Sequence, residues 1–443
     1  MRAVIGGIEF RGMPQWSDED GFSAELTGLL NSPDFKMPTR LPSMLRVTIN
    51  EAERAILVHP YLARAGGMSF KSGAPISTGV TLCAQGIIRH LPWNIRASSG
   101  VTRLRLTSAA LDLWYGEDTA TIDRKFETYE ITAHFKAVES CFATSLGELK
   151  IGLSITAPGI PAMGDYRFRT QAYATLILAQ PLKLAEAVDA AAAIEGLFEI
   201  LAGFPQRRFA FKVQLNTAPG EAPLVLEAGP SRKMSKDHPF ALFIPRAVMP
   251  DVAGLLETYL QKHKSLAIMQ TTIRYLAGDR IVLPEGFLTA CNVIESIGKA
   301  APNSNLDLPQ LLKTIAKSLK KVDPGLACRF NEEVRVKIFT HSSFKDRFDH
   351  VKAMLDDLGT PVALDHTALS KARAAYRHDV VALKPEHLDA MRAGIGLAWF
   401  LGLVWLCQEI GVPKQVLRKC ARRDLFHVER GTALALWGKR SPA

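Results

Sequence analysis

The hydrophobic pattern of this chain changes its period partway along, and this change constrains the fold more than any other feature. In the first half apolar and polar residues alternate, as in Phe22–Leu29 and Gly147–Thr156, which is the period of a half-buried β-strand. Beyond residue 240 apolar residues recur at three- and four-residue spacing, which indicates amphipathic helices. Between them lies Gly229–Pro239 (GPSRKMSKDHP), a polar stretch rich in helix and strand breakers. We therefore predict an α+β chain with a β-rich domain over residues 1–235 and an all-α bundle over residues 240–443.

The same patterns place individual elements. Further strands are expected at Leu45–Ile49, Val80–His90, Arg103–Leu106, Phe126–Phe135, Tyr166–Leu178 and Arg208–Leu215, with one helix among them at Leu182–Leu201. Later helices are expected at Asp251–Lys262, Leu266–Leu276, Gly286–Lys299, Leu308–Leu319, Phe344–Leu358, Leu369–Tyr376, Pro385–Ile410 and Lys414–Asp424. Pro385 suits the first turn of its helix, and Gly411 followed by Pro413 suits a helix end.

The charge of the chain is concentrated near its end. The 54 Lys and Arg residues outnumber the 44 Asp and Glu residues, which leaves a formal charge of +10. From Pro413 onward eight basic residues, among them Arg418, Arg422 and Arg423, face only Asp424 and Glu429, a local balance of +6. A concentrated basic surface suits a polyphosphate partner such as RNA. A solvated basic helix with no ligand explains the same charge.

Several common chemistries have no support in the sequence. The six cysteines are scattered without a CxxC pair, and no phosphate loop, HExxH zinc helix or GxSxG nucleophile turn occurs. We therefore expect no metal and no cofactor. Gly394-Ile395-Gly396 lies in an apolar stretch without a preceding strand, so it is interpreted as a helix-packing notch. The apolar run Ala393–Cys407 is shorter than the roughly 20 residues that span a bilayer, and the N-terminus lacks a secretory pattern. We expect a buried core helix, no membrane contact and a cytoplasmic protein.

One short motif carries chemistry. In Leu369–Val380 (LSKARAAYRHDV), Arg373 and His378 stand five residues apart in an R-x4-H arrangement. Arg422 and His427 have the same spacing, so spacing alone does not separate a site from an exposed basic helix end.

A family resemblance separates the two pairs. Residues Phe344–Val412 combine an amphipathic helix ending in R-x4-H, a short turn and a long apolar helix closing in LGLVWLCQEIGV. In this they resemble the ApeA-like HEPN family of bacterial defence proteins. Phe287–Lys299 (FLTACNVIESIGK), with Glu295 inside it, is similar to that family's first bundle helix.

The first half of the chain also resembles this family, in its β-rich partner domain. The similar features are Val80–Trp93, a strand-like stretch ending in Leu113–Gly116 (LWYG), and the helix running into Phe198–Phe204 (FEILAGF). The resemblance thus covers most of the chain, as a pattern of elements with one short motif.

The resemblance implies a metal-independent endoribonuclease in antiphage defence, acting on RNA, with tRNA a candidate substrate. It implies a homodimer and a trigger, from a phage or a small molecule, sensed by the first domain. His378 suits proton transfer because an imidazole titrates near neutral pH, and Arg373 suits stabilisation of the phosphate charge. Glu295 is a candidate for orienting Arg373, or a surface carboxylate. The expected products carry a 2′,3′-cyclic phosphate and a 5′-hydroxyl.

Two features depart from the family pattern or leave a choice open. The position after the arginine is usually polar in the family, often Asn, and here it is Ala374. Arg377 either adds to RNA binding, as Arg418, Arg422 and Arg423 are expected to do, or is an exposed helix residue. The alternative hypothesis is a catalytically inactive HEPN module that binds nucleic acid or forms a dimer, beside a ligand-sensing first domain.

Overall fold

The computed structural model divides the chain into two compact units, Met1–Ala202 with Arg208–His263 and Gly203–Arg207 with Lys264–Ala443. It describes residues 1–5, 7–17, 21–30, 38, 40–49, 53–65, 76–92, 94–96, 98–115, 120–125, 130–135, 139–156, 169–203, 211–228, 242–278, 281–300, 308–330, 343–378, 383–423 and 435. The expected linker Gly229–Pro239 lies outside these residues. The units part within helix α3 (Ala253–Leu276), and each is described by itself.

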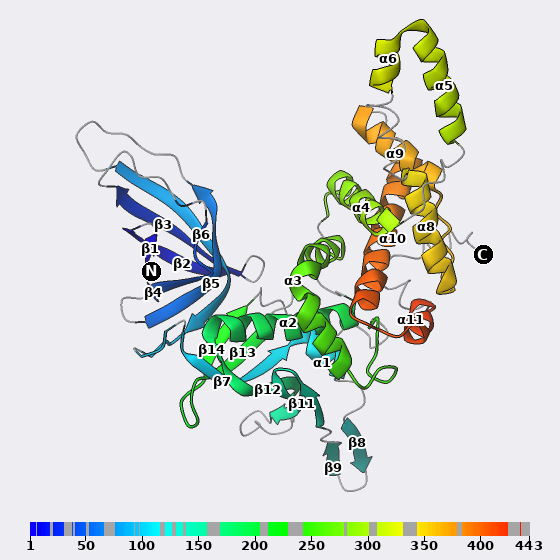
Figure 1. Ribbon diagram of the computed structural model, residues 1–443. Helices are drawn as coiled ribbons and strands as arrows, with labels where there is room; N and C mark the ends of the chain where they lie inside the picture. The colour runs from blue at the N-terminus through cyan, green and yellow to red at the C-terminus, as the bar shows by residue number, and fades with distance from the viewer. Residues whose placement is uncertain are drawn as a thin grey trace. The chain divides into compact units, whose positions relative to one another are not determined.

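The first unit begins with a closed antiparallel barrel (Figure 1). Its strands are β1 (Arg2–Ile5), β2 (Ile8–Ser17), β3 (Gly21–Leu30), β4 (Met44–Ile49), β5 (Glu53–Ala65) and β6 (Ile76–Arg89). They pair in the order β6-β3-β2-β1-β4-β5, and pairing of β5 with β6 closes the ring. The alternating apolar residues point inward, so that Phe10, Leu26, Leu57 and Leu82 form a common buried core. Closure gives each of these strands a partner on both sides over at least part of its length.

Strand β6 also belongs to a second group of strands. β3 pairs with β6 as far as Ala84, and β14 takes over on β6 from Gly86. The remaining strands are β7 (Gly100–Ser108), β10 (Ser140–Thr144), β11 (Gly147–Thr156), β12 (Arg169–Lys183), β13 (Phe211–Asn216) and β14 (Leu224–Ala228), and they continue the sheet in the order β14-β13-β7-β12-β11-β10. β8 (Ala120–Lys125) and β9 (Glu130–Phe135) form a separate two-stranded sheet.

Two helices pack on this second group of strands. α2 (Leu184–Ala202) contacts β7 and β12 and is buried along most of its length, which confirms the helix expected near this place. α1 (Ala109–Tyr115) packs beside it, with the rings of Trp114 and Phe198 5.2 Å apart. The strand expected in the stretch ending at Gly116 is confirmed for Gly100–Ser108, which form β7, and wrong for Ala109–Tyr115, which form α1. Ser108 ends β7 and its hydroxyl accepts the Leu111 N–H, which caps a helix start.

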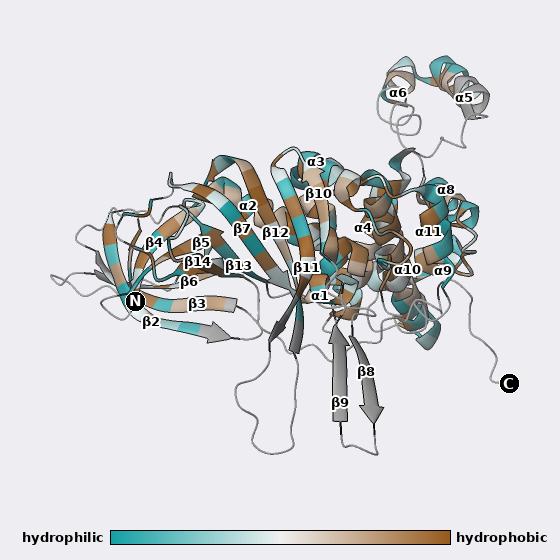
Figure 2. Ribbon diagram, turned by 90° about the horizontal axis from the view of Figure 1, so that it is seen from below, coloured by the Kyte–Doolittle hydropathy of each residue, from teal (hydrophilic) through white to brown (hydrophobic). Residues whose placement is uncertain are grey.

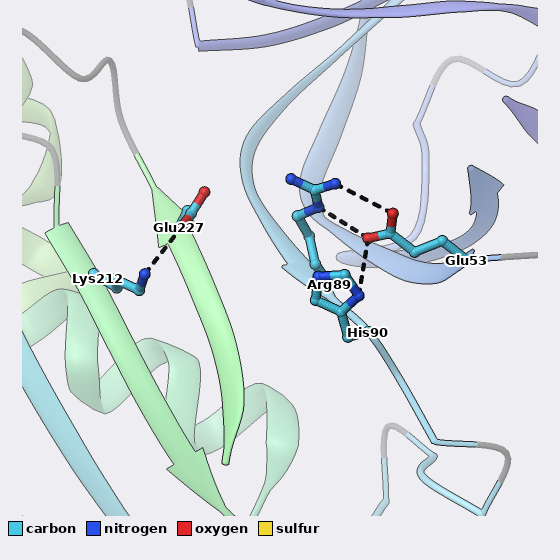
Figure 3. Close-up of polar contacts among 5 residues, drawn as sticks. All are labelled: Glu53, Arg89, His90, Lys212 and Glu227. Atoms are coloured by element: carbon cyan, nitrogen blue, oxygen red, sulfur yellow. Dashed lines mark hydrogen bonds and ion pairs between the residues drawn. The ribbon is translucent and has the colours of Figure 1, made fainter. Parts of the chain in front are cut away.

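An ion pair fastens the two strands that close the barrel (Figure 3). The Arg89 guanidinium, at the end of β6, donates from Nε and Nη2 to the two Glu53 carboxylate oxygens, at 2.9 and 3.2 Å. His90 Nδ1 lies 3.6 Å from the same carboxylate. The hydrogen bonds from Arg89 are the main reason that the pKa of Glu53 falls below its ordinary value. Lys212 and Glu227, on β13 and β14, form a more exposed pair at 3.4 Å.

The second unit is helical. Its elements are the second part of α3, then α4 (Leu283–Ile297), η2 (Gly298–Ala300), α5 (Leu308–Val322), α6 (Pro324–Arg329), α8 (Phe344–Asp357), α9 (His366–His378), α10 (Pro385–Glu409) and α11 (Lys414–Ala421). The two helices expected over Asp251–Leu276 form the single helix α3, because no breaker separates them. With the β-rich first unit, this confirms the α+β class.

α10 is the core helix of this unit. By length and hydropathy it could cross a membrane, but 78% of its most apolar window is buried inside the protein, so the expected buried core helix is confirmed. Gly394 lies against Leu369 and Phe287, where a Cβ atom would come within 2.8 and 3.2 Å of their side chains. The interpretation of this glycine as a packing notch is therefore confirmed. Figure 2 shows the apolar character of α10.

Both ends of α10 follow the sequence signals. The helix begins at Pro385, which lacks the N–H that a first turn leaves unpaired. At the other end Gly411 has a φ of +91°, a conformation that favours glycine. The Gly411 and Val412 N–H groups donate to the carbonyls of Gln408 and Cys407 at 3.0 and 2.9 Å, which is the Schellman arrangement.

The Glu53–Arg89 pair predicts a pH-dependent stability of the first unit. Because the folded pKa of Glu53 is lowered, its contribution is present above the unfolded pKa and is lost as pH falls through the folded pKa. At pH 7 we expect Glu53→Gln to cost about 1–3 kcal/mol, the range for removing one partner of a charged hydrogen bond. Thermal unfolding of both proteins from pH 7 downward should show the difference in Tm shrinking below pH 4.5.

The control is Glu227→Gln, which removes the same charge from the exposed pair in Figure 3. A surface pair contributes roughly 0–1 kcal/mol, so this variant should change Tm little at any pH. Equal losses of Tm in the two variants at pH 7, or a Glu53→Gln deficit that persists in acid, would contradict the assignment.

Candidate functional site

The arginine of the R-x4-H motif is held by a carboxylate from a neighbouring helix. Arg373 lies on α9, beside the buried residues Leu369 and Ala372 that pack into the helical unit. Its Nη1 donates to Glu295 Oε1 on α4 at 2.6 Å. The two side chains are 21% and 28% exposed, so the pair sits at the margin of the core, where water screens it only in part. The structure thus brings together Arg373 and Glu295, two of the residues singled out from the sequence.

A second arginine, not identified from the sequence, shares this carboxylate. Arg347, on α8, places Nη1 3.9 Å from Glu295 Oε2 and 3.4 Å from the Glu295 backbone oxygen. It is 16% exposed. Two guanidinium groups therefore flank one carboxylate, and the group keeps a net charge of +1.

The local sequence explains how α8 positions Arg347 beside Glu295. Ser343 and Asp346 form a capping box at the start of α8, where the Ser343 hydroxyl accepts the Asp346 N–H and the Asp346 carboxylate accepts the Ser343 N–H. Gly298, just after α4, lies against the Arg347 backbone. A Cβ atom there would come within 2.6 Å of Arg347 Cβ and 2.8 Å of its carbonyl oxygen. The glycine permits the close approach that puts Arg347 beside Glu295.

Arg373 retains donors that Glu295 does not use. A guanidinium carries five N–H donors, and the contact with Glu295 engages Nη1. The Arg373 Nε is buried and has no hydrogen-bond acceptor among the described residues. The Phe344 ring lies 5.7 Å from Arg373 Cζ, near the limit for a cation–π contact. The cation is thus oriented by Glu295. Nε is out of reach of a ligand because it is buried, and Nη2, from which no described residue accepts a hydrogen bond, remains the donor for an anion.

His378 is the last residue of α9, but its side chain and that of Arg377 lie outside the described parts of the chain. Along a regular helix, five residues correspond to about 7.5 Å of rise and a rotation of about 140°. The backbone therefore places His378 further along α9 and on another side of the helix from Arg373. Ala374, the residue after Arg373, is exposed.

The basic residues near the C-terminus make contacts within the protein. Arg418, on α11, donates to the Asp357 carboxylate at 2.9 Å and to the Asp357 backbone oxygen at 3.0 Å. Lys414 contacts the same carboxylate, and hydrogen bonds from Lys414 and Arg418 lower the pKa of Asp357. Arg422 donates to the Leu358 carbonyl at 3.3 Å. These cations complement the carboxyl end of α8.

Their expected role in RNA binding stays a prediction. Arg423 is half-buried and its N–H donates to the Cys420 carbonyl at 3.2 Å. His427, of the alternative R-x4-H pair, lies outside the described residues. Over the described parts of the chain, no group of three or more His, Cys, Asp or Glu side chains is placed to hold a metal ion.

The Glu295 bridge predicts a measurable coupling. Glu295→Gln leaves two partly buried arginines without a carboxylate, and we expect it to destabilise the helical unit by about 1–3 kcal/mol. Arg373→Gln should have a similar cost, and the double variant should lose less than the sum of the two single variants. Urea unfolding followed by circular dichroism at 222 nm measures this.

Asp349→Asn is the control, since it removes an exposed carboxylate from α8 two residues beyond Arg347. A surface change of this kind falls within about 0.5 kcal/mol. Strictly additive costs for Glu295→Gln and Arg373→Gln would show that the contact contributes nothing.

Comparisons with known proteins return no match for this chain. No protein-family model matches it, and neither a curated protein nor a solved structure does. The features that bear on function are therefore the two arginines on Glu295 and the sequence motif that links Arg373 to His378 at the end of α9.

Proposed function

We propose that the chain is a metal-independent endoribonuclease in which Arg373 and His378 act on one RNA phosphodiester. The observation that carries the proposal is the guanidinium of Arg373, which Glu295 holds through Nη1 at 2.6 Å while no described residue accepts a hydrogen bond from Nη2. A preoriented cation stabilises charge that develops on a phosphate without reorganising during the reaction. The resemblance to the ApeA-like HEPN family supplies the reaction class.

The proposed reaction is an attack by the ribose 2′-hydroxyl on its own 3′-phosphate. His378 accepts the hydroxyl proton as general base, a contribution of ~10²–10⁴-fold for a positioned group. The P–O bond to the leaving 5′-oxygen then breaks, and that oxygen takes up a proton. Arg373 donates to the phosphate oxygens as their negative charge increases. The products are a 2′,3′-cyclic phosphate and a 5′-hydroxyl, and water is not consumed in this step.

Arg347 enters the proposal as a second cation. Its Nη1 lies 3.9 Å from Glu295 Oε2, whereas Arg373 contacts Oε1. A phosphate that draws Arg373 away from Glu295 leaves that carboxylate paired with Arg347, so no buried charge is left alone. The group can therefore admit an anion at a smaller electrostatic cost than an isolated Arg–Glu pair.

The reaction has two proton transfers, from the 2′-hydroxyl and to the leaving 5′-oxygen. Either one His378 serves both, or a second group serves one of them. We propose a homodimer, as the family resemblance implies, in which a second copy brings another His378 to the same phosphate. The same resemblance motivates the remaining parts of the proposal: structured RNA such as tRNA as substrate, an antiphage role in the cytoplasm, and a first unit that senses a trigger.

The test is cleavage of labelled tRNA by the purified full-length chain with a metal chelator present. His378→Asn and Arg373→Gln should each lower the rate at least ~10²-fold, because each removes one of the two acting groups. His90→Asn is the matched control. His90 lies in the first unit with a φ of +55°, which asparagine tolerates, and its loss should leave the rate unchanged.

Fragments with cyclic-phosphate ends that vanish in both motif variants are the expected result. Cleavage that survives both substitutions would show that the active site lies elsewhere. Arg422 and His427 would then be substituted. No cleavage by the wild type, even with phage-infected cell extract as a source of trigger, would favour the inactive nucleic-acid-binding or dimerisation module. Ala374 in place of a polar residue agrees with that alternative.

A further inference from the structure

Helix α5 carries its basic and apolar residues on opposite faces. Lys313, Lys317, Lys320 and Lys321 recur at i, i+4, i+7 and i+8, and at about 100° per residue they fall within one arc of about 100°. The apolar residues Leu311, Leu312, Ile315, Leu319 and Val322 fall on the opposite side by the same count. α5 contains no Asp or Glu. This helix is therefore a cationic face backed by an apolar one.

The described lysines of this face have no carboxylate partner among the described residues. Lys317, Lys320 and Lys321 are exposed, and among the described residues no carboxylate lies within ion-pair distance of any of them. The nearest acidic residue along the chain, Asp323, is already used as the cap of α6. Its Oδ1 accepts the N–H groups of Gly325 and Leu326 at 2.7 and 3.2 Å.

This sets α5 apart from the basic tail. There the Asp357 carboxylate and the carbonyl oxygens at the end of α8 accept from Lys414, Arg418 and Arg422. A cation already paired with a carboxylate releases less free energy on meeting a phosphate than an unpaired one does. Of the two basic segments, the exposed face of α5 is the stronger candidate for an anionic partner.

The geometry of α5 favours a nucleic-acid backbone over a lipid surface. A helix on a bilayer inserts its apolar face. In α5 that face is only partly available, since Leu319 is half-buried, although Ile315 and Val322 are 37% and 84% exposed. Figures 1 and 2 show α6 side by side with α5, and the two helices pack on each other. The lysine face binds by charge alone, as phosphate contacts do.

We propose that Lys317, Lys320 and Lys321 form a phosphate-binding face for RNA, a second anchor for the substrate outside the Arg373 site. The inference deepens the proposed ribonuclease function and rests on it for the identity of the RNA as substrate. Lys317 and Lys321 are separated by one helical turn, about 6 Å along the axis, which is comparable with the distance between successive phosphates in a strand. Such a face positions RNA without reading its sequence.

The experiment measures the salt dependence of RNA binding by fluorescence anisotropy. The probe is a fluorescein-labelled RNA hairpin with a single-stranded loop, and the protein is full-length His378→Asn, which keeps the probe intact. Into this background go K317Q/K320Q/K321Q or, as the control, K150Q/K183Q/K212Q. Each triple removes three positive charges. The control lysines lie in the first unit, and Lys150 and Lys212 already pair with Glu148 and Glu227.

We expect K317Q/K320Q/K321Q to flatten the slope of log Kd against log salt concentration by about 2, since each phosphate contact on a single strand contributes about 0.7. Its Kd at 0.15 M salt should rise ~10-fold or more. The control triple should retain the slope. An equal slope in K317Q/K320Q/K321Q and its parent, an equal loss in both triples, or no RNA binding by the parent overturns the inference.

Two further measurements separate the remaining explanations. Co-sedimentation of the parent with phosphatidylserine vesicles that is lost in K317Q/K320Q/K321Q, while the RNA slope stays unchanged, would assign the face to lipid and overturn the RNA proposal. Cleavage of the same hairpin by the wild type is scored in parallel. A flattened slope without cleavage supports the lysine face as an RNA-binding surface and contradicts the ribonuclease proposal. Cleavage with an unchanged slope supports the ribonuclease proposal and contradicts the lysine face as an RNA-binding surface.

Discussion

The helical unit depends on the burial of α10. Every residue from Leu397 to Val404 is buried, so this helix is apolar around its whole circumference and other helices must cover it on every side. Gly394 and Gly402 admit those neighbours closely: Leu369 of α9 and Phe287 of α4 pack at the first, and Ile273 of α3 at the second. Covering α10 from several sides fixes the positions of α3, α4 and α9 around it. The position of the candidate site follows from that requirement.

Because α4 and α9 both pack on α10, the polar residues at the margins of their buried faces meet. Arg373 borders the buried Leu369–Ala372 face of α9, and Glu295 lies next to the buried Ile294 of α4. A charge at such a margin keeps part of its hydration and gains a stronger attraction than in bulk water. The arrangement holds the Arg373 cation in place through Nη1 and leaves Nη2 unused by Glu295. Packing thus accounts for the orientation of the Arg373 side chain. The several donors of a guanidinium account for arginine at this position.

Local sequence patterns predicted much of this fold. Contacts between residues that are far apart in the chain were not predicted from such patterns. β11 was placed at Gly147–Thr156 and α10 at its first residue, because period and caps are local properties. Closure of the barrel depends on pairing between β5 and β6, which no local pattern encodes. The helix α1 was missed since seven residues give too few turns to show a period. At the site, Glu295 and Arg373 came from the family resemblance. Arg347 shares a site with them only through packing of α8 near Gly298, and the capping box in its segment predicts a helix start and no binding site.

The two basic segments of this chain show why a count of charges is a poor guide to a binding surface. The tail holds more cations, and a count alone favoured it. Three of its described side chains, those of Lys414, Arg418 and Arg422, however, complement Asp357 and the last carbonyls of α8, where the helix dipole presents negative charge. α5 has fewer cations and no such complement among the described residues. Since the attraction of a phosphate for a cation is measured against what that cation already contacts, the unpaired face binds more strongly per charge. The absence of acidic residues from α5 is therefore the more informative feature of the sequence.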